Sequence, residues 1–537
     1  MTHLFIFGGY GMRRSFISVA SVAALLCNLA VPFQVHAAGG QTATPITHLV
    51  IIFDENNSFD HYFGTYPAAQ NRPGETPFHA AADTPAINGL TPTLLNNNPN
   101  LANAGNPMRL SPSEGSTCDN INKYTPEQEA FDNGLLDKFN ITSVAAECGS
   151  GFFFAPNLAM YYYDGNTVTA LWNYAQHFAM SDNFFDSEFG GTVEGHLNLL
   201  SGQTHGLVVM SGETVPATTV SNGTVINNIN PISDDCALPT SPTGSSPNIS
   251  MTGNNIGNLL NAAKVTWGWF YDGFARTGFS GGVATCSSLY NPHYAPFNYY
   301  PSTSNPHHAP PSSPAAIGTS ADAANHNYDL SNLWEAIDAN NMPAVTFIKA
   351  SSPNTGHPMD GTPLQEQAIL VNTINRLMQS RYWNNMAIII AYDDSDGWYD
   401  HVAAPIINHS TDAKNDAIQG TAGVNGACGV LGSGADNDRC GFGVRLPYLV
   451  ISPFAKHNYV DHSLNDTTST MRFIEYNWHL GTLGSLGNAN DKQSFDVLAS
   501  GSILGMFDFG SRPIPENRSV ILNPANGEVV RSDVWGY

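Results

Sequence analysis

The sequence predicts an α/β sandwich with a central, mainly parallel sheet that is flanked by helices and carries long loop insertions. Two observations predict it. Several runs of five to seven apolar, mostly β-branched residues are typical of strands buried on both faces of a sheet. Segments with helical spacing alternate with these runs along the chain, and this order favours helices packed on a parallel sheet. With no internal repeat and no clean linker, we expect residues 38–537 to form a single domain.

The elements follow from local patterns taken in chain order. Five strands are expected where an apolar run meets polar or turn-forming residues: 49–53, 265–270, 344–349, 386–392 and 446–451. Five helices are expected where apolar residues recur at helical spacing: 126–139, 167–176, 331–340, 364–380 and 467–480. Residues 68–115 and 207–330 are rich in Pro, Asn, Ser, Thr and Gly, which predicts irregular insertions.

The charge balance restricts the partners. The formal net charge is −24 and the sequence pI is about 4.9. This argues against nucleic acid or an anionic membrane surface as an electrostatic partner. An anionic substrate would need local positive charge, which a metal ion supplies most simply.

The first 37 residues have the pattern of a signal peptide, with the start at Met1 or at Met12. Arg13 and Arg14 precede an apolar stretch, and small residues then favour cleavage after Ala37. The twin arginines resemble a Tat signal but lack its usual trailing Lys, so the Tat and Sec routes both stay open. We expect a secreted or periplasmic protein without a transmembrane anchor, because no later segment is long and apolar enough to span a bilayer.

Cleavage after Ala37 removes Cys27 and leaves six cysteines, an even number that favours disulfides in an exported chain. Cys428 and Cys440 close a short loop and form the first expected pair. Sequence order suggests Cys118–Cys148 and Cys236–Cys286 as the others.

Two predicted strands, far apart in sequence, end in oxygen-rich clusters. Glu55 and Asn56 follow the first, and Asp393 and Asp394 follow the fourth. If these strands are neighbours in a parallel sheet, three carboxylates and one amide meet at the carboxyl edge, where ligands bind in such folds. Crowded carboxylates repel one another, and a divalent cation such as Mg²⁺, Ca²⁺ or Mn²⁺ removes that repulsion.

Both clusters also have a plain structural interpretation. Ser58 or Asp60 could cap a short helix after the first strand. The run from Asp393 to Gly397 has the composition of a tight turn. Convergence of the two clusters in one place is what would favour the metal site.

Thr192 follows the flexible pair Gly190-Gly191 and precedes an apolar, helix-compatible stretch. A hydroxyl at a helix N-terminus meets backbone N–H groups and the positive end of the helix dipole, which suits a phosphate. The alternative is that Thr192 only caps the helix. His293 and His357 lie in loops, where a histidine is most often a surface or packing residue.

At several points the sequence resembles a known family. Residues 55–64 (ENNSFDHYFG) resemble the signature of the bacterial phosphoesterase family that includes non-haemolytic phospholipases C and a group of acid phosphatases. The resemblance recurs, in order, at residues 189–203 (FGGTVEGHLNLLSGQ), 293–300, 351–358 (SSPNTGHP), 392–402 (YDDSDGWYDHV), 445–456 and 472–478. It implies an alkaline-phosphatase-like core and metal-dependent hydrolysis of phosphate esters.

The resemblance also implies roles for individual residues. Thr192 would be the nucleophile and would touch the metal, and His293 and His357 would contact the phosphoryl group or protonate the leaving oxygen. One divalent ion (Ca, Mg, Mn or Zn) would be held by Glu55, Asn56, Thr192, Asp393 and Asp394. This chain departs from the family at Asn57, where Arg is usual, and at Asn122, where a His is common.

These observations lead to the hypothesis of an exported phosphoesterase, of acid phosphatase or phospholipase C type, that acts on small phosphate esters or phospholipid headgroups. The acidic charge and the early end of the chain after the core favour small soluble esters. A non-catalytic protein that binds phosphate esters is the alternative, supported by Asn57 and Asn122. Sulfatase chemistry is less favoured because residues 189–195 lack the pattern that sulfatases need to make formylglycine.

Overall fold

The computed structural model describes residues 41–100, 105–144, 146–221, 223–237, 248–410, 412, 414–418, 428, 439–486, 501–510 and 518–533. All of them belong to one compact unit, Ala37–Tyr537. The expected signal peptide lies outside the described residues. No helix in the described part of the chain combines the length and the apolar character that crossing a membrane requires.

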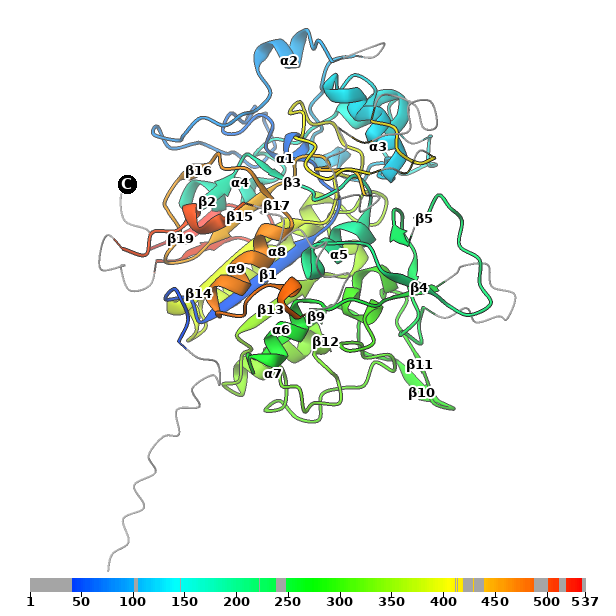
Figure 1. Cartoon of the computed structure of the whole chain (residues 1–537). Helices are drawn as coiled ribbons and strands as arrows, with labels where there is room; N and C mark the ends of the chain where they lie inside the picture. The colour runs from blue at the N-terminus through cyan, green and yellow to red at the C-terminus, as the bar shows by residue number, and fades with distance from the viewer. Residues whose placement is uncertain are drawn as a thin grey trace, which may run out of the picture. The chain divides into compact units, whose positions relative to one another are not determined.

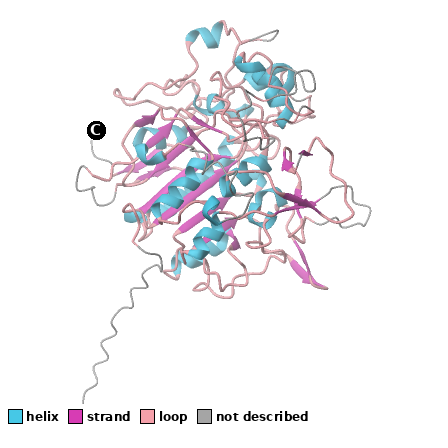
Figure 2. Ribbon diagram, in the orientation of Figure 1, coloured by secondary structure: helices cyan, strands magenta, loops and turns pink. Residues whose placement is uncertain are grey.

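The core of the unit is an eight-stranded sheet with the order β12-β9-β13-β1-β14-β15-β2-β16 (Figures 1 and 2). All neighbouring strands are parallel except at β15, which is antiparallel to both of its neighbours. The expected α/β class with a mainly parallel sheet is confirmed. In that order the strands are Asn327–Asp329, Trp267–Tyr271, Val345–Lys349, His48–Asp54, Met386–Tyr392, Tyr448–Ile451, Ala179–Ser181 and Tyr459–Asp461.

The middle of the sheet is its most apolar part. β1 lies between β13 and β14, and its residues from Leu49 to Asp54 are buried, as is every residue of the two neighbours. Burial on both faces explains the continuous apolar runs in the sequence. Asp54 is level with Tyr392 in the register of β1 and β14, so the chain leaves both strands at the same edge.

The expected strand at 446–451 forms β15, and its antiparallel direction was not foreseen. The chain leaves β14 at the carboxyl edge, runs through residues 393–447 and re-enters the sheet from that same edge. Such a return needs no helical crossover, because only parallel neighbours require one.

Helices flank the sheet. α5 packs against α6 and α9, and α4 packs against α8. The bounds are α1 Phe59–Phe63, α2 Pro92–Asn96, α3 Tyr124–Phe131, α4 Thr169–His177, α5 Thr192–Ser201, α6 Ile256–Ala262, α7 Leu330–Asp338, α8 Pro363–Met378 and α9 Thr468–Asn477.

The helix expected over 126–139 is shorter than predicted. α3 ends at Phe131 because Asp132 and Asn133 adopt left-handed backbone angles (φ 42° and 56°), which stop an α-helix. Short 3-10 and π turns continue to Ser143.

The two expected insertions differ in structure. Residues 68–115 are mostly loop, with α2 and a 3-10 turn, whereas residues 207–330 contribute β9 and β12 to the central sheet and hold several short strands. The remaining strands are β3 Phe184–Phe185, β4 Leu207–Val209, β5 Val220–Ser221, β6 Thr224–Val225, β7 Asn230–Pro231, β8 Asn248–Met251, β10 Gly278–Ser280, β11 Val283–Thr285, β17 Asn465–Asp466, β18 Val520–Leu522 and β19 Val529–Ser532.

The three expected disulfides, Cys118–Cys148, Cys236–Cys286 and Cys428–Cys440, are all present.

Candidate metal centre and active site

Three adjacent parallel strands deliver polar residues to one edge of the sheet. Glu55 and Asn56 follow β1, Asp393 and Asp394 follow β14, and the loop after β13 carries His357. The backbone continues the strand pairing past the sheet, because Asp393 N donates to Asp54 O at 3.2 Å. The four side chains at 55, 56, 393 and 394 have no exposed surface.

The Asn56 amide lies at the centre of this cluster. One of its two terminal atoms is 2.9 Å from Glu55 Oε2, 3.0 Å from Asp393 Oδ1 and 3.2 Å from Asp394 Oδ2. With the amide oxygen in that position, four oxygens converge with no hydrogen between them, an arrangement that a cation stabilises. With the nitrogen there, the NH₂ group donates to the carboxylates instead. Asn56 reaches this position through a left-handed backbone conformation (φ 58°), which Asn tolerates.

The carboxylates are held in an environment that disfavours their charge. Burial raises the pKa of Asp393 well above its ordinary value, and the neighbouring Glu55 charge raises it further. Burial and the Asp393 charge do the same to the pKa of Asp394. The pKa of Glu55 is raised by burial as well, although Lys349 opposes the shift.

Lys349, the last residue of β13, contacts the Glu55 carboxylate, and both side chains are fully buried. Its ammonium also lies 3.5 Å from Asp54 O and 4.6 Å from the centre of the Tyr294 ring. Lys349 therefore fixes one oxygen of Glu55 and leaves the other facing Asn56.

The donor set fits a hard divalent cation. All of its converging atoms are oxygens, which Mg²⁺, Ca²⁺ and Mn²⁺ prefer. The three carboxylates and the single ammonium of Lys349 leave two negative charges when all are ionised, and one divalent ion balances them. The two strand ends thus meet the geometric condition for a shared metal site.

Thr192 is the first residue of α5, and Gly191 occupies the N-cap position. The alternative that Thr192 itself caps the helix is wrong, so its hydroxyl is not used for that purpose. One turn later, His196 Nδ1 lies 2.7 Å from Thr192 O and 3.6 Å from Asp393 Oδ2. His196 thereby connects the start of α5 to the carboxylate cluster.

Gly195 allows this close approach of α5. A Cβ at residue 195 would lie 2.0 Å from the carbonyl oxygen of Asp393. Gly195→Ala should therefore destabilise the protein by about 2 kcal/mol or more and weaken divalent-cation binding, because the helix and the Asp393 backbone must separate. Thermal unfolding with and without Mn²⁺ measures both effects. Gly510→Ala is the matched control, since a Cβ there meets nothing within 4 Å. Unchanged stability and cation affinity in Gly195→Ala would contradict this account of the contact.

The two candidate histidines lie in different places. His357 reaches the cluster, with Nε2 3.1 Å from the second terminal atom of the Asn56 amide. His293 lies on a 3-10 helix, Pro292–Tyr294, that packs against α5. Burial lowers the pKa of His293 to about 4, so its imidazole is neutral at pH 7.

Asn122, which stands where the family commonly has His, also reaches the cluster. Its Nδ2 donates to Asp394 Oδ1 at 3.0 Å, and Asp396 N donates to the same oxygen at 2.7 Å. The turn that the sequence suggested exists, with Trp398 N bonded to Ser395 O and Asp396 N bonded to Asp394 Oδ1. The other oxygen of Asp394, Oδ2, still faces Asn56. Asn57, in place of the usual Arg, donates to Glu55 O at 2.7 Å.

A buried ion network ties together the two segments that follow the cluster. Ser58 caps α1, as the sequence allowed. Two residues on, the Asp60 carboxylate lies 3.1 Å from Arg445 Nη2 and 2.6 Å from His401 Nδ1. The Asp400 carboxylate lies 3.1 Å from Nε of the same arginine. The segments after Asn56 and after Asp394 are thus held by the same guanidinium.

The sequence reasoning missed Lys349 and His196 as members of the site. Lys349 is a lone cation at the end of an apolar strand, a pattern that signals a buried ion pair. His196 stands four residues after Thr192, so the two residues share one face of a helix. The role of Lys349 could be inferred only once the strand order was known, and that of His196 only once the start of α5 was known.

Comparisons with known proteins place the chain in a family. The model of the family described as Phosphoesterase family matches residues 46–481. The chain is 25% identical over 485 residues to a non-hemolytic phospholipase C of Pseudomonas aeruginosa, covering 86% of this chain and 59% of that protein. It is 24% identical over 510 residues to phospholipase C A of Mycobacterium tuberculosis, covering 89% and 84% respectively.

Among solved structures, an alkaline phosphatase superfamily protein of Vibrio parahaemolyticus is similar at a TM-score of 0.30 and 9% identity, covering 83% of this chain and 69% of that one. The family model spans most of the chain, including both strand ends, Thr192 and the loop with His357. The chain belongs to the Phosphoesterase family.

Proposed function

We propose that this protein is a metal-dependent phosphoesterase in which Thr192 is the nucleophile and Glu55, Asn56, Asp393 and Asp394 hold one divalent cation. The observation that carries the proposal is the convergence of three buried carboxylates and one amide beside the first turn of α5. Family membership and the phospholipase C relatives support hydrolysis of phosphate esters.

In this proposal each residue has a separate catalytic role. A bound divalent cation would lower the pKa of a hydroxyl placed against it and offset negative charge on the phosphoryl oxygens. Thr192, at the positive end of the α5 dipole, would lose its hydroxyl proton to solvent and attack phosphorus, and the bond from phosphorus to the ester oxygen would break. Water would then attack the resulting phosphothreonine and release the free Thr192 hydroxyl. His357, beside Asn56, would donate a hydrogen bond to a phosphoryl oxygen or a proton to the leaving oxygen. His293, beside α5 and neutral at pH 7, would donate a hydrogen bond to a phosphoryl oxygen.

We also propose that the protein is exported through the signal peptide at residues 1–37. Three disulfides in the described part of the chain support this, since such bonds persist in oxidising compartments. Phosphomonoesters and phospholipid headgroups are the two substrate classes of the proposal, and the phospholipase C relatives support the second.

The function is tested by assaying the purified protein on two substrates after metal removal and after adding back each divalent ion. We expect phosphate release from p-nitrophenyl phosphate or phosphocholine release from phosphatidylcholine, lost with a chelator and restored by Mn²⁺, Mg²⁺, Ca²⁺ or Zn²⁺. Tight binding of both esters by the metal-loaded protein without any turnover would favour the non-catalytic alternative.

A further inference from the structure

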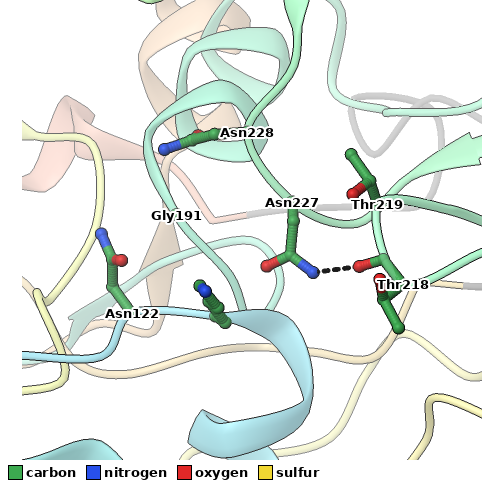
Figure 3. A pocket seen from close by; sticks show the side chains of 7 residues that line it. Asn122, Gly191, Thr218, Thr219, Asn227 and Asn228 are labelled. Atoms are coloured by element: carbon green, nitrogen blue, oxygen red, sulfur yellow. Dashed lines mark hydrogen bonds between the residues drawn. The ribbon is translucent and has the colours of Figure 1, made fainter. Parts of the chain in front are cut away.

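A pocket of about 290 Å³ lies at the start of α5, with Gly191 in its lining (Figure 3). Its lining includes Gly191, the residue before Thr192, and Asn122, which donates to Asp394. In Figure 3, Asn122 lies on one side of the pocket and Thr218 and Thr219 lie on the other. The volume is near the lower end of the range for small organic ligands, roughly 300–1,000 Å³. Because Asn122 belongs to both the pocket and the site, and Gly191 directly precedes Thr192, the organic group of a bound phosphate ester would extend into the pocket.

Residues between β6 and β7 fix this pocket to the nucleophile helix. Val193 N donates to Asn228 Oδ1 at 3.0 Å, so Asn228 supplies the cap that Gly191 cannot supply. Asn227 is held as well, accepting from Tyr124 N at 3.3 Å. The pocket wall therefore keeps a fixed position relative to Thr192.

The lining has a uniform chemistry. Its side chains are amides and hydroxyls, together with the ammonium of Lys123, and the described residues that line it include neither a carboxylate nor an aromatic ring. Among the hydrogen bonds of the described residues, none uses the Asn228 NH₂ group or the hydroxyls of Thr218 and Thr219. These groups remain available to a ligand.

Amides and hydroxyls both donate and accept hydrogen bonds, which matches alcohol groups that do the same. A quaternary ammonium such as choline is instead recognised by aromatic faces. On the basis of the proposed function, we infer that this pocket binds a polyhydroxylated organic group on the phosphate ester, of sugar, inositol or glycerol type. The choline headgroup is the class that it disfavours.

The first test compares kcat/KM of the metal-loaded enzyme for myo-inositol 1-phosphate and for phosphocholine. We expect the inositol ester to be preferred by about tenfold or more, because several hydrogen bonds to the polyol are lost with choline. Equal values, or a preference for phosphocholine, would overturn the inference while the proposed function would stand.

The second test removes the two hydroxyls without changing side-chain volume. In Thr218→Val/Thr219→Val, the ratio of kcat/KM for myo-inositol 1-phosphate to that for p-nitrophenyl phosphate should fall about tenfold. Thr214→Val, an exposed residue of the same segment outside the lining, is the matched control and should keep the ratio of the unmodified enzyme. An unchanged ratio in the double variant would overturn the inference.

A binding measurement separates this inference from the proposed function. Calorimetry with metal-loaded Thr192→Ala measures affinity for both esters without turnover. Tighter binding of myo-inositol 1-phosphate than of phosphocholine supports the pocket even if the unmodified protein hydrolyses neither. Equal affinities would overturn the inference, whatever the protein hydrolyses.

Discussion

Replacing Thr192 with alanine should lower phosphate-ester turnover on the order of 10³-fold or more, because no other group can form the covalent intermediate at that position. The residue is nearly buried at the first position of α5, and the N-cap role belongs to Gly191. The substitution should therefore leave helix stability almost unchanged. It should weaken cation binding only by the loss of one of the five proposed oxygen ligands. Steady-state kinetics on p-nitrophenyl phosphate measure the turnover, and thermal unfolding of the same sample with and without Mn²⁺ measures stability and cation binding.

Thr192→Ser is the matched control for this prediction. A serine hydroxyl occupies nearly the same place, so we expect turnover to remain within about tenfold of the original enzyme. Trapped phosphoenzyme should appear with Thr and Ser but not with Ala. Turnover by Thr192→Ala at the original rate would rule out the nucleophile assignment.

Replacing Asp394 with asparagine should abolish the gain in stability that a divalent cation gives and should stabilise the metal-free protein by on the order of 1–3 kcal/mol. Three buried carboxylates lie together in the cluster, and removing one charge relieves both its burial cost and its repulsion with Asp393. Asparagine keeps the acceptor oxygen for Asn122 and Asp396 N. A cation bound at the proposed site would stabilise the original protein by roughly 2.7 kcal/mol at a concentration of 100 Kd, and this gain should vanish in the variant.

The stability difference between metal-free Asp394→Asn and the original protein should depend on pH. Because burial raises the folded-state pKa of Asp394 above its ordinary 3.8, the folded metal-free protein holds that proton more tightly than the unfolded chain does. Its stabilising contribution is complete below pH 3.8 and is lost as the pH rises through the folded-state pKa. The stability advantage of Asp394→Asn should therefore grow as the pH rises. Chemical unfolding of metal-free samples from pH 4 to 8 measures this, and a lower stability of the variant at pH 8 would contradict it.

The strands could be predicted because each carries its signal locally. β1, β14 and β13 are apolar runs with abrupt polar ends, and burial on both faces requires such a composition. The end of α3 was harder to place, because the apolar spacing continues to Phe139 while Asp132 and Asn133 adopt left-handed backbone angles that the spacing does not indicate. The direction of β15 depends on the path of residues 393–447, which no local pattern specifies.

In the candidate site, too, the features with a local sequence signal could be predicted and those that depend on tertiary structure could not. The polar ends after β1 and β14 could be predicted, because parallel strands place their carboxyl ends at one edge. The pairing of Lys349 with Glu55 required knowing that β13 lies beside β1, a tertiary fact. The cap that Asn228 gives to α5 joins residues 35 positions apart, and neither residue carries a local sign of it.

The most direct test of the proposed metal site is anomalous X-ray diffraction from crystals of the Mn²⁺-loaded protein. The proposal predicts one strong peak at roughly 2.0–2.6 Å from side-chain oxygens of Glu55, Asn56, Asp393 and Asp394, with the Thr192 hydroxyl oxygen in the same coordination sphere. A peak bound elsewhere, or a Thr192 hydroxyl turned away from the ion, would contradict it.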